Sequence, residues 1–433
     1  MTKVWNQDNS VSEIVEKFTV GNDKELDVVL APYDVLGSIA HVKMLGKVGL
    51  VTSAESQQLV AELEKIYKSV NEPDFSIPQG FEDIHSYVEY LLVEALGDTG
   101  KKVHTGRSRN DQVLVDLHLY VKAEIKKICE GIDVLFESMI SLGEKHQKVM
   151  MPGYTHMQIA MPSSFGLWFG AYAETLIDDL VFLNAAKKIA DQNPLGSAAG
   201  YGSSFPLDRQ LTTDLLDFEV LKINSVAAQM SRGKLEKSLA FAMATVAGTL
   251  SKFSMDIVLY MNQNFGFISF PDELTTGSSI MPHKRNPDVF ELIRAKCNKI
   301  QALPNEIIIL TNNLPSGYHR DFQLLKENLF PAIDELKSCL SMVSFMLEYI
   351  NINDKILEGD KYQLLYTVEE VNKLVSEGVA FRDAYHMVSD QVKSGKFKNT
   401  GEELKHTHLG SIGNPGFDLI REKFKRVLND LNF

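Results

Sequence analysis

The stretch QVLVDLHLYVKAEIKKICEGIDVLFESMISLGEKH, residues Gln112–His146, decides the fold class. Apolar residues recur along it at spacings of three and four, which is the period of one face of an α-helix. Gly131 is the weak point of this pattern. A glycine inside a helix costs only about 1 kcal/mol relative to alanine, so we expect one unbroken helix.

The same periodicity returns in four later stretches, and two of them contain a proline. Because the periodicity resumes after Pro304 and after Pro331, these prolines predict kinks inside their helices and not helix ends. The four predicted helices are Ser163–Gln192, Lys234–Gln263, Asp288–Asn313 and Asp321–Ile350. Each of the five helices would be roughly 40–50 Å long.

Strand signals are scarce, so the predicted fold class is all-α. The segment Leu239–Ala247 is apolar nearly all round, and such a helix must be covered on every side. One bundle of five helices leaves little material to cover its outer faces. We therefore infer that subunits pack bundle against bundle.

The patterns divide the chain into three predicted domains. Residues 1–107 form an N-terminal helical domain, in which an amphipathic helix is capped at Thr52 or Ser53. Residues 108–354 form a central domain of five long helices, and residues 355–433 a small C-terminal helical domain. A length of 433 residues is compatible with two to four domains.

Composition excludes several classes of protein. The net charge is −13, from 44 basic and 57 acidic residues, so a general nucleic-acid binder is not expected. The three cysteines, Cys129, Cys297 and Cys339, lie far apart and show no metal-binding spacing, which suits core positions in a reducing cytosol. The first residues, MTKVWNQDNS, lack the apolar core of a secretory signal, so no such signal is expected. The sequence has no run of about 18 apolar residues, so no membrane span is expected.

Polar, glycine-containing segments fall between the long helices. Taken singly, each has a structural interpretation: His104 and His156 as satisfied structural histidines, Lys284 and Arg285 as solvated charges, and Asn286 as a helix cap. Five such segments, each joined to a long helix, favour a functional site. They are His104–Gln112, Met151–Gln158, Asn193–Arg209, Thr275–Pro287 and Pro315–Glu327.

The first long helix separates Asn110 from His156. If this helix is unbroken, its two ends lie about 50 Å apart. Two residues at that distance cannot share one site within one subunit. If both act on the substrate, they come from different chains.

The segment TGSSIMPHKRNP, residues 276–287, resembles the signature of the fumarase/aspartase superfamily, whose members eliminate an amine or hydroxyl group to release fumarate. Within that superfamily, HTGRSRNDQV, MPGYTHMQ, NPLGSAAG, YHRDFQLLKE and GVAFRDAYHMV are similar to the argininosuccinate lyase family, in the family's order from about residue 15 to about residue 390.

This resemblance implies an all-α, three-domain subunit in a homotetramer with a core of twenty helices. Four active sites would each be built from three subunits. The implied reaction converts argininosuccinate to arginine and fumarate, in arginine biosynthesis in the cytoplasm, without a cofactor or metal. No nucleic-acid partner and no membrane contact are expected.

The resemblance also implies roles for individual residues. Ser278 would take the proton from the carbon beside the succinyl carboxylate. Because a free hydroxyl ionises far above neutral pH, the lysine and the loop amides would have to lower the pKa of Ser278. The leaving nitrogen would be protonated by His156, by Thr155 or by a water molecule. Glu291 of a neighbouring chain would orient His156. Lys284 and Asn286 would stabilise the doubly charged intermediate. The carboxylates and the arginine part would be held by Ser108, Arg109, Asn110, Tyr318, Gln323 and Lys326.

The sequence departs from the family pattern at several positions, and two rival interpretations are open. His283 makes the loop closer to adenylosuccinate lyase, so that enzyme or another fumarate-releasing lyase is an alternative. A non-catalytic structural oligomer is an alternative of a different class. The other departures are Ile159, Met161, Ala227, Ser231 and Gly233, and no clear counterpart of the family's N-terminal substrate-contact serine lies near Gly21.

Overall fold

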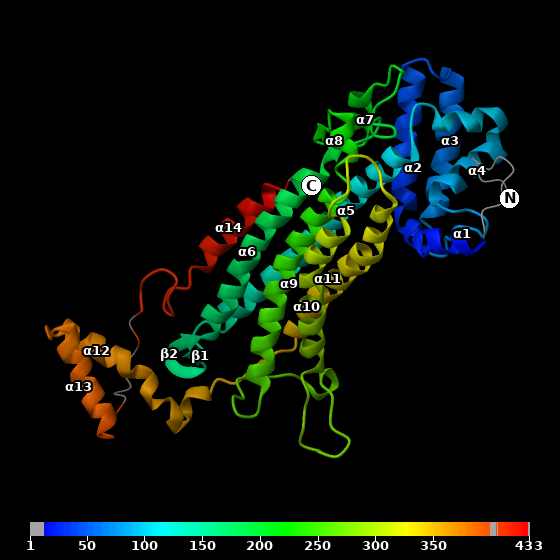
Figure 1. Ribbon diagram of the computed structural model, residues 1–433. Coiled ribbons are helices and arrows are strands. Elements are labelled where there is room, and N and C mark those ends of the chain that lie inside the picture. Colours follow the sequence, from blue (N-terminus) through cyan, green and yellow to red (C-terminus); the bar gives the residue numbers. More distant parts are fainter. Residues whose placement is uncertain (1–12, 399–403, 405, 432–433) are drawn as a thin grey trace. The chain divides into compact units, whose positions relative to one another are not determined.

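The computed structural model of the protein describes residues 13–398, 404 and 406–431. The stretch MTKVWNQDNS, where no secretory signal was expected, lies outside the described residues. The described residues form fourteen α-helices. These are α1 (Glu13–Val20), α2 (Asp23–Lys47), α3 (Ser53–Val70), α4 (Ile84–Leu96), α5 (Arg109–Lys145), α6 (Phe165–Ala190), α7 (Arg209–Leu215), α8 (Ser225–Gln229), α9 (Lys234–Met261), α10 (Asp288–Leu310), α11 (Leu325–Leu347), α12 (Thr367–Ser376), α13 (Phe381–Lys393) and α14 (Phe417–Asn429) (Figure 1).

The five predicted long helices are confirmed as α5, α6, α9, α10 and α11. Helix α5 continues through Gly131 without a break, and Pro304 and Pro331 lie inside α10 and α11. Helix α11 begins at Leu325 and not at Asp321, because Arg320–Leu324 forms a separate 3-10 helix, η3. The other 3-10 helices are η1 (Gly97–His104), η2 (Asp272–Leu274), η4 (Ile356–Glu358) and η5 (Asp360–Tyr366).

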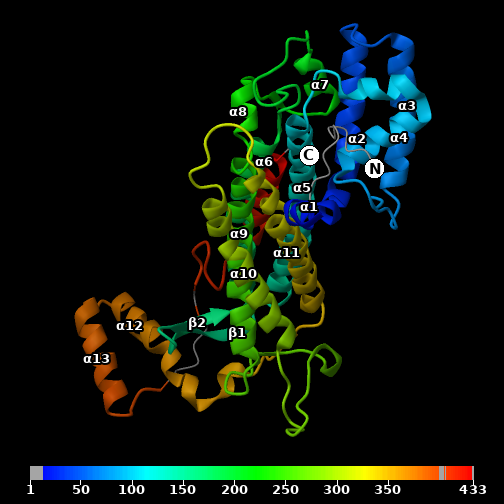
Figure 2. The ribbon, with the colours of Figure 1, turned by 45° about the vertical axis from the view of Figure 1, so that its right-hand side comes forward.

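Short strands accompany the helices among the described residues. Strands β1 (Met150–Thr155) and β2 (Gln158–Ser164) form an antiparallel hairpin directly after α5, in a segment for which no strand was predicted (Figure 2). A two-residue turn joins the two strands, and so short a connection allows only antiparallel pairing. The remaining pairs are β3 (Gln192–Asn193) with β4 (Val220–Leu221), and β5 (Ile268–Ser269) with β6 (Asn351–Ile352).

The chain separates into two compact units. Unit 1 comprises the described residues up to Ile128, with Phe182–Thr245 and Lys299–Leu336. Unit 2 comprises Cys129–Val181, Val246–Asn298 and the described residues from Lys337 onward. Each of the five long helices contributes one part to each unit. The three-domain division drawn from the sequence stays a prediction.

Unit 1 has a core between α2, α3 and α4, which lie side by side (Figure 1). Leu59 and Leu63 of α3 are fully buried there, in one apolar cluster with Val35 of α2 and Val88 of α4. Helix α3 starts as predicted, because the Thr52 side chain accepts a hydrogen bond from the Glu55 amide and Glu55 returns one. This reciprocal cap satisfies free N–H groups at the helix start.

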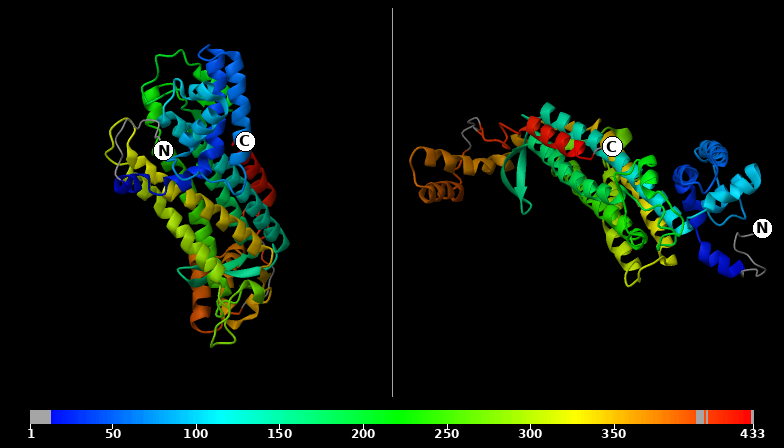
Figure 3. Two further views of the ribbon diagram at one scale, coloured as in Figure 1. Left: turned by 90° about the vertical axis from the view of Figure 1, so that its right-hand side faces the viewer. Right: turned by 90° about the horizontal axis from the view of Figure 1, so that it is seen from above.

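Unit 2 has an aromatic core. The red helix α14 lies along α5, where the rings of Phe424 and Phe136 stack with centroids 3.7 Å apart (Figure 3). In the same unit Trp168 stacks on Phe253, joining α6 to α9. The carboxylate of Asp256 accepts hydrogen bonds from the Trp168 indole at 3.0 Å and the Tyr172 hydroxyl at 2.7 Å. The polar edges of these rings are therefore satisfied inside the core.

Two of the described helices, α2 and α9, are long and apolar enough to cross a membrane by length and composition. The share of the apolar window buried inside the protein is 61% in α2 and 50% in α9. Core helices of soluble proteins have the same character. The three cysteines are buried, as expected for core positions.

Candidate functional site

The start of α5 is fixed by a capping arrangement in unit 1. Ser108 Oγ accepts a hydrogen bond from the Asn110 amide at 3.3 Å, and Asp111 accepts one from the Ser108 amide at 2.9 Å. The other oxygen of Asp111 accepts the amides of Gly196 and Ala198, both at 2.9 Å. One buried carboxylate therefore ties the segment Asn193–Arg209 to the residues that begin α5. The segment Asn193–Arg209 therefore supports the start of α5, but its residues do not line the cavity that lies there.

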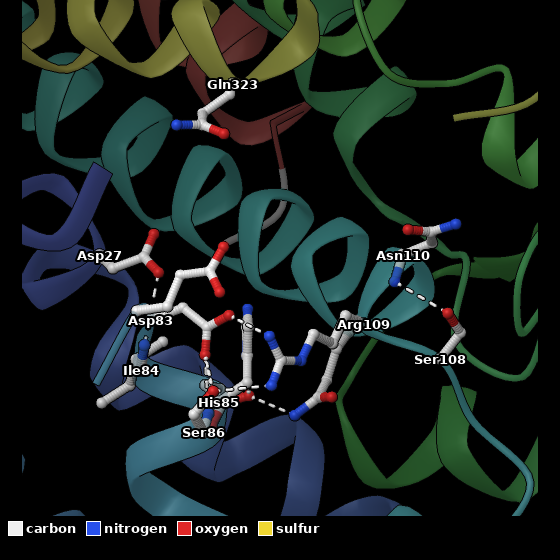
Figure 4. Close-up of polar contacts among 12 residues, drawn as sticks. Asp27, Asp83, Ile84, His85, Ser86, Ser108, Arg109, Asn110 and Gln323 are labelled. Atoms are coloured by element: carbon white, nitrogen blue, oxygen red, sulfur yellow. Dashed lines mark hydrogen bonds and ion pairs between the residues drawn. The ribbon is translucent and has the colours of Figure 1, made fainter. Parts of the chain in front are cut away.

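A cavity of about 230 Å³ lies in unit 1 at this end of α5. Five of the six predicted substrate-binding residues line it. The sixth, Ser108, accepts a hydrogen bond from the Asn110 amide (Figure 4). The structure therefore brings together two segments far apart in the sequence, His104–Gln112 and Pro315–Glu327. The lining residues are Asp23, Asp27, Glu82, Asp83, His85, Arg109, Asn110, Val113, Tyr318, Arg320, Gln323 and Lys326.

The long basic side chains of the cavity are each paired with acids. Arg109 donates to Asp83 at 2.7 Å and to the Ser86 hydroxyl at 2.7 Å (Figure 4). Lys326, which is 4% exposed, contacts Asp27 at 2.6 Å and also Asp23. A charged group in so dry a place needs such partners.

The remaining lining cation, Arg320, pairs with Glu82 at 3.2 Å. The amide of Gln323 donates to the carbonyl oxygens of Thr19 and Val20, both at 3.0 Å. Arg320 also donates to Thr19, at 3.2 Å. These bonds satisfy carbonyl groups at the C-terminus of α1 and hold the α1–α2 junction at the cavity.

A buried ionic cluster lies behind the cavity wall. His85 Nδ1 is 2.8 Å from Asp34 and 3.8 Å from Asp116, and Gln112 donates to Asp34 at 2.9 Å. Burial alone lowers the pKa of His85, but the carboxylate of Asp34 outweighs it and raises that pKa to about 9. Burial and the neighbouring Asp34 raise the pKa of Asp116 well above its usual range. The cluster thus holds a charged imidazole between two acids of unequal strength.

The predicted catalytic residues lie in unit 2, and Thr155 and His156 lie at the tip of the β1–β2 hairpin. Thr155 pairs with Gln158, so His156 and Met157 form the two-residue turn. Their φ angles are 53° and 59°, in the left-handed region that glycine and asparagine prefer. Both side chains are exposed. A turn of this kind without glycine holds backbone strain, a feature found at functional sites.

The loop Thr275–Pro287 is closed at its base. Thr276 and Asn286 form a β-bridge, and the Asn286 side-chain amide donates to Thr276 Oγ1 and the Gly277 carbonyl, both at 3.3 Å. The interpretation of Asn286 as the cap of α10 is therefore wrong, because its side chain closes the loop while α10 begins at Asp288. Arg285 pairs with Asp272 at the same base.

Inside this loop two main-chain amides point at Ser278. Its Oγ accepts hydrogen bonds from the amides of Met281 at 3.1 Å and Ile280 at 3.4 Å. Lys284 lies in the same loop, is exposed, and has no ion-pair partner among the described residues. Glu291, in the first turn of α10, is likewise exposed, and within the described part of the chain neither its carboxylate nor the His156 ring makes a hydrogen bond or ion pair.

The acidic half of the cavity was not predicted from the sequence; it consists of Asp23, Asp27, Glu82 and Asp83. The signal was present in EDIH, residues 82–85, where an acid precedes an apolar helix as an N-cap does. Asp83 caps α4 by accepting the Ser86 amide at 2.8 Å. Asp23 and Asp27 gave no such signal, because only the packing of α2 against the start of α11 makes them a pair around one lysine.

Two departures from the family pattern have a local reason. Gly233 has φ of 79°, and a side chain there would meet Thr311 Cγ2 at 2.8 Å. Its amide donates to Glu236 at 2.6 Å. Ser231 Oγ donates to the Ala228 carbonyl at 2.6 Å and lies 3.3 Å from His118 Nε2. Nothing in the structure explains Ile159, Met161, Ala227 or His283.

Comparison with known proteins gives a consistent set of matches. A protein family described as "Lyase" matches residues 6–302. Argininosuccinate lyases of Phocaeicola vulgatus and Bacteroides thetaiotaomicron are each 55% identical over 100% of this chain and 96% of their own length. The argininosuccinate lyase of Thermotoga neapolitana is 40% identical over 90% of this chain and 98% of its own length.

Solved structures share the fold at low sequence identity. An EDDS lyase in complex with formate has a TM-score of 0.77 and 21% identity, over 98% of this chain and 91% of that one. A class II fumarase from Schistosoma mansoni has a TM-score of 0.72 and 18% identity, over 96% of this chain and 94% of that one. These likenesses confirm the predicted all-α fumarase/aspartase fold.

The raised pKa of His85 predicts a pH dependence of stability. Because its folded pKa of about 9 exceeds the ordinary value of 6.5, the stabilisation is complete below about pH 6.5 and is lost as the pH rises through about 9. The His85→Gln variant should therefore melt below the wild type by a margin at least about 2 °C larger at pH 6.5 than at about pH 9.5. Thermal melting followed by circular dichroism measures both margins.

The control is His386→Gln, which changes an exposed histidine of α13. Its melting temperature should stay close to that of the wild type at both pH values. A margin for His85→Gln that is constant or grows with pH would contradict a protonated imidazole in the cluster.

Proposed function

The chain belongs to the argininosuccinate lyase family of carbon–nitrogen lyases, and we propose that it eliminates fumarate from argininosuccinate to leave arginine. The family membership rests on 55% identity along the whole chain. The observation that carries the proposal is the cavity in unit 1, where the predicted substrate-binding residues converge. Its paired acids and bases suit a substrate that bears both carboxylates and cationic nitrogen groups. The identity to named argininosuccinate lyases does not favour adenylosuccinate lyase or a structural oligomer.

In the proposed reaction Ser278 is the base. Its oxygen takes a proton from the carbon beside the succinyl carboxylate, the electron pair moves into that carboxylate, and then the C–N bond breaks. A free hydroxyl ionises far above neutral pH, so the alkoxide needs help. The amides of Ile280 and Met281 already donate to Ser278 Oγ, and Lys284 in the same loop supplies a positive charge. This arrangement supports the proposed role.

Negative charge on the substrate carboxylate must be stabilised before the bond breaks. We assign this to Lys284 and Asn286. Lys284 is an exposed cation on the loop, and Asn286 presents its amide group at the loop base. Donors placed where charge develops are usually the largest contribution to such a reaction.

The leaving guanidino nitrogen needs a proton as the C–N bond breaks. His156, Thr155 or a water molecule held by them would supply it. The strained hairpin turn presents both side chains to solvent with no internal partner for the imidazole. Glu291, which is also without a partner in the described chain, would orient His156 across a subunit boundary.

Several chains would complete each site. Helix α5 has 37 residues and is unbroken, so it is about 55 Å long. The proposed substrate-binding residues Ser108, Arg109 and Asn110 lie at its start, and the proposed acid group follows its end. A substrate of a few ångströms cannot touch both ends. We infer a homotetramer in which neighbouring chains share each site.

The cell compartment and cofactors follow from the same proposal. Proton transfer and elimination move no electrons between separate redox partners, so the proposed reaction needs no redox cofactor, and we propose that it proceeds without a metal. Three buried cysteines, far apart in the sequence, suit a reducing compartment. We propose that the protein acts in the cytoplasm, in arginine biosynthesis.

A substrate panel tests the proposed reaction. Purified protein is offered argininosuccinate, adenylosuccinate, aspartate and malate separately, and fumarate is followed by its ultraviolet absorbance. We expect fumarate from argininosuccinate only, with arginine released in equal amount. Release from adenylosuccinate instead, or from none of the four, would sink the proposal.

Two neighbouring serines test the proposed base. Ser278→Ala should lower kcat by about 10² to 10⁴, because it removes the group that accepts the proton. Ser279→Ala is the matched control, since it deletes the same hydroxyl from the exposed adjacent residue. It should retain nearly full kcat. Steady-state kinetics with argininosuccinate measures both, and similar losses in the two variants would refute the assignment.

Subunit mixing tests the shared site. Asn110→Ala and His156→Asn should each be nearly inactive, and exchange of their subunits should restore activity, because some sites then take each intact residue from a different chain. The control pairs Asn110→Ala with Lys326→Ala, two residues of one cavity. That mixture should stay inactive, since every cavity carries one defect. No recovery in the first mixture, despite exchange confirmed by mass spectrometry, would contradict shared sites.

A further inference from the structure

We propose that Asp23 is a specificity-determining residue that binds a cationic group of the arginine half of the substrate, its ammonium or its guanidinium. This inference rests on the proposed function and goes beyond it, because neither the sequence pattern nor the resemblance pointed to Asp23. Asp23 is the first residue of α2, and its side chain lines the cavity in unit 1.

The pairing of charges in the cavity isolates Asp23. Four carboxylates line it, those of Asp23, Asp27, Glu82 and Asp83, against three long basic side chains. Arg109 pairs with Asp83 and Arg320 with Glu82. Lys326 alone faces two acids. The surplus negative charge of these ion pairs therefore lies around Lys326.

One of the two acids is already held by the protein. Asp27, which is 2% exposed, contacts Lys326 at 2.6 Å and accepts the Ile84 amide at 3.4 Å (Figure 4). Among the described residues, the Asp23 side chain bonds only to Lys326, and it remains partly exposed, with 19% of its side-chain surface open. Asp23 is thus the acid that an incoming ligand can reach.

The surplus charge costs the free protein energy. Burial raises the pKa of Asp23, the cation of Lys326 opposes this rise, and the neighbouring Asp27 adds to it. A bound cation would supply the missing positive charge and favour the ionised carboxylate. A substrate carboxylate placed there alone would instead meet two like charges beside one lysine.

Argininosuccinate carries a cation of the required kind at two places in its arginine half. An α-ammonium group would donate to Asp23 while the adjacent carboxylate lies toward Lys326, and a guanidinium would bind the carboxylate with two parallel donors.

The test compares three ligands that differ at one group. Arginine has both cations, argininic acid replaces the ammonium by a hydroxyl, and citrulline replaces the guanidinium by a neutral urea. Each is measured as a competitive inhibitor of fumarate release by the wild type and by Asp23→Asn. The matched control is Asp74→Asn, which makes the same chemical change at an exposed residue of unit 1.

For the ammonium we expect Asp23→Asn to weaken arginine and citrulline about tenfold and to leave argininic acid unchanged. For the guanidinium we expect arginine and argininic acid to weaken and citrulline to stay unchanged. Either pattern supports the proposal and identifies the group. Asp74→Asn should change none of the three constants.

Two outcomes would overturn the inference: unchanged constants in Asp23→Asn, or an equal loss for all three ligands. If Asp23→Asn does not fold, as judged by its melting curve, Asp23→Glu takes its place. Asp23→Glu retains the charge, so two affinity ratios, arginine to argininic acid and arginine to citrulline, should each stay within about threefold of the wild-type value. A larger loss in both ratios counts against the proposal. Failure of the wild type to release fumarate from argininosuccinate would instead refute the proposed function.

Discussion

The hydrogen-bond ladder of α5 is the constraint on which the rest of the structure depends. It runs from Arg109 to Lys145 without interruption, although Gly131 gives the chain an opportunity to bend. In unit 2 a side chain at Gly131 would meet Leu340 of α11 at 3.3 Å, so close packing of two helices accounts for the glycine. The small loss in helix propensity is offset by burial of apolar surface around it.

The start of α5 shows how one helix end organises a site. Its first residues face a cavity whose cations are all paired with acids, so the ligand must enter a preformed ionic network. Behind that network, His85 is held charged by Asp34 inside a fully buried cluster. Arg109 and Lys326 are held by their own acid partners, Asp83 for Arg109 and Asp27 with Asp23 for Lys326, and removing one partner of a buried pair is costly.

Unit 2 differs from the cavity of unit 1, because most of its proposed catalytic side chains are exposed and are not enclosed by the described residues of that unit. The hairpin tip and the loop Thr275–Pro287 are held by main-chain bonds at their bases, while His156, Lys284 and Glu291 stay exposed. The left-handed backbone of the hairpin turn fixes the position from which the His156 side chain projects. Among the described residues, the imidazole has no hydrogen-bond partner. In the proposed assembly these groups gain their partners from neighbouring chains.

The sequence by itself determined the helices, their continuity and the five segments that join them, because the apolar period and the turn residues are local properties of the chain. It also identified the family, through motifs such as TGSSIMPHKRNP, whose residues are contiguous. Only the tertiary structure decided which acids surround Lys326, since Asp23 and Asp27 are some 300 positions away along the chain. The same holds for the hairpin at His156 and for the role of Asn286, because strand pairing and loop closure depend on contacts that no local pattern encodes.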